Sequence, residues 1–332
     1  MTNFTDAIQA LCNTGRFPTE LTAGFLAFCK SYEEAISPNT PPLDTFTTFL
    51  QKVASQLQSP YSFEPYHKAL RAPTDYYQLG LDFIRPLVDF TTSRIEGKEA
   101  LKSIQEAISN KENVILLSNH QTEIDPQIIS LLLEKEYPEL AQEMIFVAGH
   151  RVTTDPLAVP LSLGRNLICI YSKRHIDSPP EKKAEKLTHN QKALKGLDEL
   201  LNVGGKCIYI APSGGRDRID NSGQIEVAPF DPQAVEMFYL LSQKAKRPTH
   251  FHSLALSTYW LLPPPDQVLT EIGEQRKTTF SPALLHFSPR IAMETVGGAG
   301  SITDKKEKRK VRTEAIWQQV ATAYSNFWKL HN

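Results

Sequence analysis

The sequence predicts an α/β fold, in which a mixed, mostly parallel sheet is flanked by helices and preceded by a small N-terminal bundle of helices. Short apolar runs that do not alternate with polar residues recur between helical stretches, which is typical of strands covered on both faces of a sheet. Before about residue 75, apolar residues instead recur every three or four positions. Because 332 residues are about twice a usual domain, we expect a helical bundle domain over 1–75 and an α/β domain over 76–332.

Two periodic stretches predict the helices of the bundle. Residues of the first stretch share one helical face, namely Leu21, Phe25, Phe28 and Tyr32. The second stretch covers 46–57 and follows a turn rich in proline. A further helical stretch is expected from roughly 76 to 110, before the first strand.

The strands of the sheet are predicted from five apolar runs. These runs are VILLSN (114–119), MIFVAG (144–149), LICIYS (167–172), CIYIAP (207–212) and FHSLALS (251–257). Helical segments such as 127–136 and 181–202 separate them. The segment around 284–292 is expected to be a further, antiparallel strand.

The tail over 301–330 should form a helix. Apolar residues at helical spacing would dock it on the core, namely Trp317, Val320, Tyr324 and Trp328. Its first part, DKKEKRKVR (304–312), is most simply a solvated basic face. Binding to an acidic protein is the main alternative, ahead of nucleic-acid binding.

Composition and charge exclude several classes of protein. The 36 Lys and Arg residues nearly cancel the 37 Asp and Glu, so no overall charge draws the chain to nucleic acid. No apolar run exceeds five residues, whereas a membrane-spanning helix needs about 20, so we expect no transmembrane segment. The N-terminus shows no targeting signal and the four cysteines show no CxxC spacing, which favours a cytoplasmic protein with reduced thiols. A trimmed plastid protein would look the same.

The most informative segment is SNHQTEIDPQ (118–127), which directly follows a predicted strand. His120 is therefore expected at the carboxyl end of a strand, where open α/β sheets bind their ligands. Asp125 precedes a proline and could simply cap a helix that starts at Pro126. The two residues together can do more. The carboxylate can orient one ring nitrogen of the histidine while the other nitrogen accepts a proton, and this pair is the base half of a Ser-His-Asp triad. No G-x-S-x-G motif supplies a serine, so the attacking alcohol would belong to the substrate.

Two further loops follow predicted strands and carry cations. APSGGRDRID (211–220) offers Arg216 and Arg218, whose guanidinium groups suit a phosphate or carboxylate. The alternative for this loop is a solvated turn in which the arginines pair with nearby aspartates. YSKRHID (171–177) offers three more donors for a cationic pocket opposite His120, namely Lys173, Arg174 and His175. The alternative for this segment is a solvated basic loop.

Neither nucleotide nor metal binding is favoured by the remaining motifs. The loop at 211–220 is neither a P-loop nor a G-x-G-x-x-G fingerprint. His250 and His252 would share one face of a strand, but no third ligand is spaced nearby. We therefore expect packed or hydrogen-bonded histidines, no metal and no cofactor.

Four blocks in this order resemble the soluble plastid-type glycerol-3-phosphate 1-O-acyltransferases, a family with bacterial relatives and a small helical domain. The blocks are NHQTEIDPQIISLLLE, VAGHRVTTDPL, GRNLICIYSKRH and IAPSGGRDR, and the first holds the family's His-x4-Asp signature. The resemblance covers at least 113–295 and implies that His120 is the general base and that Asp125 orients it. It also implies that basic residues bind the substrate phosphate, namely Arg174, His175, Arg216 and Arg218. The chain departs from the family's lysine at Arg174 and from the wider superfamily's glutamate at Ser213.

The resemblance further implies a reaction and its partners. A fatty acyl group would pass from an acyl-carrier-protein thioester, or from acyl-CoA, to the 1-hydroxyl of glycerol 3-phosphate, giving 1-acylglycerol 3-phosphate. Two other readings stay open, namely a thioester or phosphoester hydrolase in which His120 activates water, and a non-catalytic module that binds a carrier protein. We expect no nucleic-acid partner, a transient membrane contact for product release, and a location in a bacterial cytoplasm or a plastid stroma.

Overall fold

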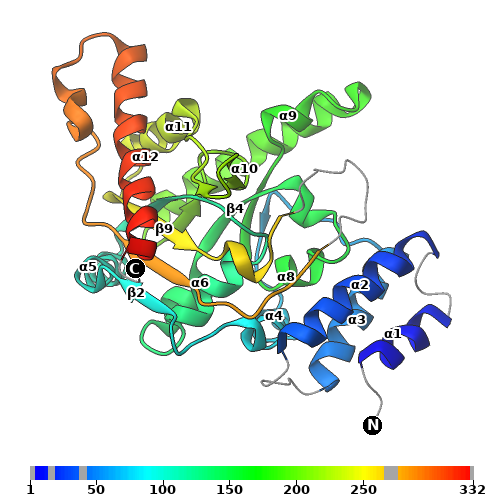
Figure 1. Cartoon of the computed structure of the whole chain (residues 1–332). Helices are drawn as coiled ribbons and strands as arrows, with labels where there is room; N and C mark the ends of the chain where they lie inside the picture. Colours follow the sequence, from blue (N-terminus) through cyan, green and yellow to red (C-terminus); the bar gives the residue numbers. More distant parts are fainter. Residues whose placement is uncertain (1–3, 14–18, 37–42, 265–275, 330–332) are drawn as a thin grey trace.

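The computed structural model of the chain describes residues 4–13, 19–36, 43–264 and 276–329. Three layers make up its larger part, with a central sheet between two sets of helices, and a group of N-terminal helices lies beside them (Figure 1). The predicted α/β class, with a mostly parallel sheet and N-terminal helices, is confirmed.

Eight strands in the described part of the chain form the main sheet, in the order β1-β5-β4-β6-β3-β9-β10-β2. Five neighbouring strands, β5-β4-β6-β3-β9, are parallel, whereas β10 runs antiparallel to β9 and β1 antiparallel to β5. Their bounds are β1 (Tyr66–His67), β2 (Arg94–Glu96), β3 (Asn113–Ser118), β4 (Ile145–Gly149), β5 (Asn166–Ile170), β6 (Cys207–Ile210), β9 (Thr249–Ser257) and β10 (Leu284–Phe287). The five predicted parallel strands and the antiparallel strand are all present. A separate hairpin of β7 (Arg218–Ile219) and β8 (Ile225–Glu226) follows β6.

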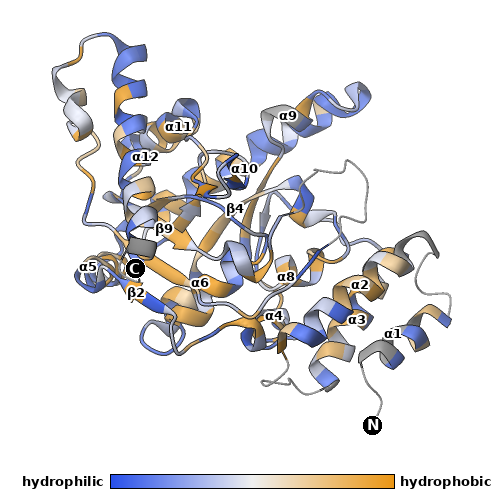
Figure 2. Ribbon diagram, in the orientation of Figure 1, coloured by the Kyte–Doolittle hydropathy of each residue, from blue (hydrophilic) through white to orange (hydrophobic). Residues whose placement is uncertain are grey.

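Alternate residues of the central strand β3 enter two different hydrophobic clusters. Ile115 and Leu117 pack with α10 (Lys183–Val203), α11 (Pro232–Lys244) and α12 (Lys305–Lys329). Val114 and Leu116 pack with α5 (Lys98–Ser109), α6 (Asp125–Leu133) and α7 (Pro138–Glu143). Both faces of the sheet are therefore covered, which explains why the strand sequences lack polar alternation. Figure 2 shows the resulting band of hydrophobic strands inside the molecule.

The N-terminal helices form a third hydrophobic cluster. They are α1 (Phe4–Asn13), α2 (Thr19–Ile36) and α3 (Leu43–Gln58), and they pack on α4 (Tyr76–Ile84). The Tyr32 hydroxyl donates to the carbonyl of Phe83 at 2.6 Å, and the Phe83 ring stacks on Phe49. This cluster continues into Ile124 and Ile128, at the start of α6. The helical part thus touches the segment that carries the predicted site.

Short connecting helices complete the described chain. They are η1 (Arg85–Leu87), η2 (His150–Thr153), α8 (Val159–Leu163), α9 (Lys173–Ile176), η3 (Pro180–Lys182), η4 (Tyr259–Leu261) and η5 (Val296–Ser301). The tail forms α12 as predicted, with Val320 and Tyr324 buried and Trp317 Nε1 donating to the carbonyl of Val227 at 3.1 Å. The side chain of Trp328 lies outside the described residues. Of the helices described, none is both long enough and apolar enough to cross a membrane.

Candidate active site

The carboxyl ends of the parallel strands meet at one edge of the sheet, and the predicted site residues follow them there. His120 lies two residues beyond β3, and its Nδ1 is 2.8 Å from Asp125 Oδ2. The Asp125 side chain is 1% exposed, whereas that of His120 is 29% exposed. Because the buried carboxylate holds Nδ1, Nε2 is the ring nitrogen that can accept a proton from a bound molecule.

Asp125 does not cap the helix that follows it, so that alternative for Asp125 is wrong. Ile124 occupies the N-cap position of α6 and makes no side-chain cap hydrogen bond. The Asp125 carboxylate points back into the loop, where it accepts from Gln121 N at 2.9 Å and from Thr122 N at 3.1 Å. It also accepts from Thr122 Oγ1 at 3.0 Å and from Thr258 Oγ1 at 2.6 Å. These contacts fix the carboxylate in the position from which it meets His120 Nδ1.

The same contacts bear on how a carbonyl oxyanion would be stabilised. Backbone N–H groups near Asn119 or at the start of α6 are the candidate donors to such an oxyanion. In the structure, the N–H groups of Gln121 and Thr122 donate to Asp125, and that of Ile124 donates to Thr122 Oγ1 at 3.2 Å. These three donors therefore serve the loop itself.

Arg216 and Arg218 lie on the loop that follows β6, the strand next to β3. Both are partly buried. Burial raises the pKa of the Glu123 carboxyl, but the charges of Arg276, Arg216 and Arg151 outweigh burial and bring this pKa below its ordinary value. Positive charge from separate loops therefore converges on Glu123, three residues from His120.

The third predicted cluster lies at the same edge but farther along the sheet. Lys173, Arg174 and His175 belong to α9, just beyond β5. β5 is three strand spacings from β3, which is about 14 Å at the usual spacing of ~4.8 Å. The side chains of Lys173 and Arg174 lie outside the described residues. His175 is exposed, and its ring centre is 5.4 Å from that of His150, which follows β4.

His150 was not singled out from the sequence. Burial lowers the pKa of His150, and the charges of His175, Lys186 and Arg151 lower it further. A neutral imidazole between two strand ends extends the polar edge from His175 towards β6. The structure thus brings His120 and Asp125 to the end of one strand and the loop 211–220, here called the arginine loop, to the end of the neighbouring strand. His175 lies farther along the same edge of the sheet.

An ion-pair cluster beside His120 was also missed from the sequence. Arg276 pairs with Glu123 and, at 2.8 Å, with Asp155 Oδ2. It joins the loop after β3, the loop after β4 and the connection between β9 and β10. No spacing in the sequence could have indicated these contacts, because 121 residues separate Arg276 from Asp155.

The remaining histidines and cysteines have ordinary environments. His250 Nε2 lies 2.6 Å from Glu112 Oε2, and His252 Nδ1 lies 2.9 Å from the carbonyl of Ser288. Within the described ranges, no three His, Cys, Asp or Glu side chains are grouped as metal ligands. The four cysteines are free, as predicted, and three of them are buried.

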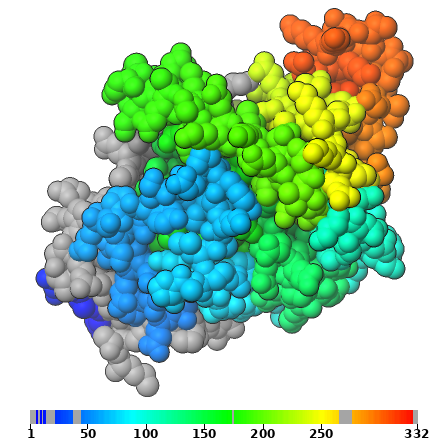
Figure 3. Space-filling model, turned by 180° about the vertical axis from the view of Figure 1, so that it is seen from behind, coloured from blue at the N-terminus to red at the C-terminus, as the bar shows by residue number. Residues whose placement is uncertain are grey.

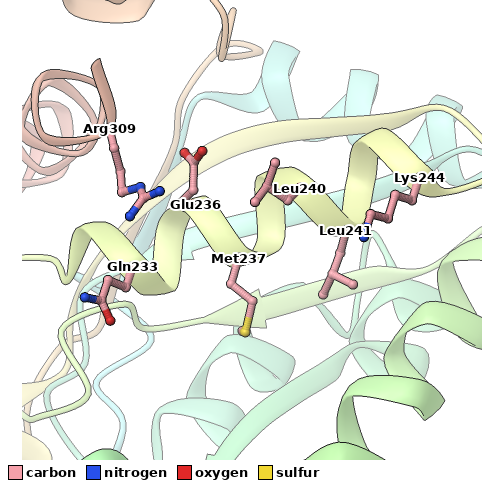
Figure 4. Close-up of a pocket in the computed structure, with 7 residues that line it drawn as sticks. All are labelled: Gln233, Glu236, Met237, Leu240, Leu241, Lys244 and Arg309. Carbon is pink, nitrogen blue, oxygen red and sulfur yellow. The ribbon is translucent and has the colours of Figure 1, made fainter. Parts of the chain in front are cut away.

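A shallow groove of about 410 Å³ lies apart from these residues, on the outer side of α11 (Figure 4). Apolar side chains of α11 line its floor, and Lys244 and Arg309 border it. Its remaining lining residues are Gln233, Glu236, Met237, Leu240 and Leu241. None of the predicted site residues is among them.

Comparison with known proteins identifies the family of this chain. Residues 94–253 match the family model described as Acyltransferase. The chain is 40% identical over 325 residues to glycerol-3-phosphate acyltransferase ATS11, chloroplastic, of Cucurbita moschata. This match covers 96% of this chain and 72% of that protein. It is 38% identical to the chloroplastic glycerol-3-phosphate acyltransferase of Pisum sativum and 36% identical to that of Arabidopsis thaliana, each match covering 96% of this chain and 70% of the relative. The chain belongs to the glycerol-3-phosphate acyltransferase family.

Proposed function

We propose that this protein transfers a fatty acyl group from a thioester to the 1-hydroxyl of glycerol 3-phosphate, giving 1-acylglycerol 3-phosphate. The observation that carries the proposal is the 2.8 Å contact between His120 Nδ1 and the buried carboxylate of Asp125. It leaves a partly exposed imidazole whose Nε2 can take a proton. The names of the relatives supply the acceptor, because each is called a glycerol-3-phosphate acyltransferase.

In the proposed mechanism, His120 Nε2 removes the hydroxyl proton as that oxygen attacks the thioester carbonyl carbon. The tetrahedral intermediate then collapses, the carbon–sulfur bond breaks, and the imidazolium returns the proton to the departing thiolate. Asp125 keeps its charge throughout and stabilises the imidazolium. Neither an acyl-enzyme nor a metal is required by these steps.

The substrate phosphate is proposed to bind to the cations at the same sheet edge. Arg216 and Arg218 follow β6, the strand next to β3, and would form charge-assisted hydrogen bonds with phosphate oxygens. Lys173, Arg174 and His175 would provide the outer part of the pocket. Glycerol 3-phosphate offers a hydroxyl at one end and a dianion at the other, which matches this arrangement of a base and cations.

The donor is proposed to be an acyl-carrier-protein thioester, with acyl-CoA as the alternative. Two segments of the sequence are rich in lysine, EKKAEK (181–186) and DKKEKRKVR (304–312), and they lie at opposite upper corners of the molecule in Figure 3. Within the first, Lys186 is buried and donates to the carbonyl of His175, and Lys183 pairs with Asp177. Within the second, three lysines are exposed, namely Lys305, Lys306 and Lys310. We therefore favour 304–312, together with the adjacent groove of Figure 4, as the face that meets an acidic carrier protein.

Product analysis with a labelled acyl donor tests the proposal against the alternatives. The wild-type protein should form labelled 1-acylglycerol 3-phosphate only when glycerol 3-phosphate is present. Release of free fatty acid at the same rate with and without this acceptor would indicate a hydrolase. Carrier-protein binding without turnover, unchanged in His120→Ala, would indicate a binding module.

The compartment and the membrane contact belong to the same proposal. The relatives are named chloroplastic, so we propose a plastid stroma for this protein, or the cytoplasm if its source is a bacterium. The product carries a single acyl chain, and a transient membrane contact would release it.

A further inference from the structure

Asp217 lies between Arg216 and Arg218, yet its side chain is completely buried. Its Oδ2 accepts from Asn119 Nδ2 at 2.8 Å and from Gln121 Nε2 at 3.1 Å. Asn119 and Gln121 are the two neighbours of His120 in the sequence. One carboxylate oxygen on the arginine loop therefore holds both sides of the predicted base.

The backbone of Asp217 makes a third contact with the same segment. Its N–H donates to the carbonyl of His120 at 2.7 Å. Its second carboxylate oxygen, Oδ1, accepts from Ala228 N at 3.0 Å and so also fixes the far side of its own loop. Asp217 thus ties the position of the arginines to the position of the imidazole.

The contacts extend from Asp217 to the end of β9. The Asn119 amide donates to the carbonyl of Leu256 at 3.0 Å, and Gln121 Oε1 accepts from Thr258 N at 2.7 Å. Thr258 also donates to the carboxylate that orients His120. Three strand ends therefore meet around Asp217, which fixes the loop that carries His120 relative to the loop that carries the arginines.

An ionised carboxylate suits this place for a specific chemical reason. Three donors point at its two oxygens, from Asn119, Gln121 and Ala228. An asparagine would turn an NH2 group towards one of them and leave it unpaired. A buried charge is costly, and burial raises the pKa of Asp217 to about 6. A side chain kept only for stability would gain from being neutral.

We propose that Asp217 is a positioning residue that fixes the distance between His120 and the phosphate-binding arginines, so that binding of the phosphate aligns the substrate hydroxyl with the base. This inference rests on the proposed function. It adds a role to a residue of the arginine loop that does not itself touch the substrate. Alignment of this kind matters because a misplacement of about 1 Å can cost about 100-fold in rate.

The test compares two acceptors in three proteins. Glycerol 3-phosphate has both the hydroxyl and the phosphate, whereas glycerol has only the hydroxyl. The proteins are the wild type, Asp217→Asn and the control Asp220→Asn. Asp220 is an exposed carboxylate on the same loop, and it accepts hydrogen bonds from Ser222 and Gln224 of its own turn.

Asp217→Asn should lower kcat/KM for glycerol 3-phosphate by about 10- to 100-fold. It should change the rate with glycerol less than threefold, because no phosphate is present to align that acceptor. Asp220→Asn should leave both rates within twofold of wild type. Equal losses with both acceptors would mean that Asp217 acts on His120 alone, and no loss with either would mean a structural role; each result overturns the proposal.

A second measurement does not depend on turnover. Inorganic phosphate should slow amide hydrogen exchange over 119–125 in the wild type and in Asp220→Asn, but not in Asp217→Asn. Equal slowing in all three proteins, or none in the wild type, would overturn the coupling. A wild type that acylates neither acceptor would instead refute the proposed function, and the exchange experiment would still decide the role of Asp217.

Discussion

The buried carboxylate of Asp217 should make the stability of this protein depend on pH in an unusual direction. Burial raises its pKa from 3.8 to about 6. The folded protein therefore holds this proton more tightly than the unfolded chain does. The stability that comes from the proton is complete below about pH 3.8 and is lost as the pH rises through about 6.

The size of the effect follows from the same two values. A tenfold change in an acid constant is worth about 1.4 kcal/mol, so moving the pKa from 3.8 to about 6 corresponds to about 3 kcal/mol. At pH 7 the ionised Asp217 should thus lower the free energy of unfolding by about 3 kcal/mol relative to its neutral form. Asp217→Asn removes the titration, although it loses one hydrogen bond.

Urea denaturation followed by tryptophan fluorescence measures this difference. The free energy of unfolding of Asp217→Asn, minus that of the wild type, should increase by about 2 to 3 kcal/mol between pH 4 and pH 7, with most of the change below pH 6. For Asp220→Asn, the free energy of unfolding minus that of the wild type should instead decrease as the pH rises, because hydrogen bonds from Ser222 lower the pKa of Asp220 in the folded protein.

A constant difference between Asp217→Asn and the wild type from pH 4 to pH 7 would refute this reasoning. It would show that the folded and unfolded states hold the Asp217 proton equally. The carboxylate would then carry no electrostatic cost, and one argument for its functional role would be lost.

Three further predictions concern the proposed reaction. Arg216→Ala or Arg218→Ala should raise KM for glycerol 3-phosphate at least tenfold while KM for the acyl donor changes little, and unchanged steady-state constants would assign these arginines a structural role. His120→Ala should lower kcat by about 10²- to 10⁴-fold without unfolding the protein. Asp125→Asn should lower kcat at least 100-fold, because the amide favours the wrong imidazole tautomer. A wild-type kcat in Asp125→Asn would show that Asp125 does not orient His120. KM for acyl carrier protein should rise with salt concentration, and it should rise further when lysines of 304–312 are replaced by glutamate. KM for acyl-CoA should respond less to both changes. A KM for the carrier protein that does not change with salt would rule out electrostatic docking.

Much of the sheet edge was predictable because its signals are local. Most of the parallel strands are short apolar runs, and the polar residues that follow them necessarily meet at the carboxyl edge of a parallel sheet. The pairing of His120 with Asp125 was also predictable, since five residues and a tight turn separate them. The short edge strands β1 and β2 were missed because two or three residues carry no periodicity. The domain boundary near residue 75 stays a prediction.

Contacts between distant segments could not be predicted. Asp217 and Asn119 are 98 residues apart, and the Asp217 side chain gave no sign of burial between two arginines. The sequence alone also left open a second role for Asp125. An aspartate before a proline fits a helix cap equally well, and one of the donors that hold the carboxylate in the loop, Thr258, is 133 residues away in the sequence.

The hydrophobic cluster of the N-terminal helices has a consequence for recombining members of this family. Ile124 and Ile128 belong to that cluster, and between them lies Asp125. A chimera that took its helices from one relative and its sheet from another would have to match side-chain volumes across this boundary, or the carboxylate would lose its support. We therefore expect the bundle and the His120 loop to be inherited as one unit. Substitutions of Phe49 or Phe83 should then be compensated by substitutions at the start of α6, and not only by substitutions within the N-terminal helices.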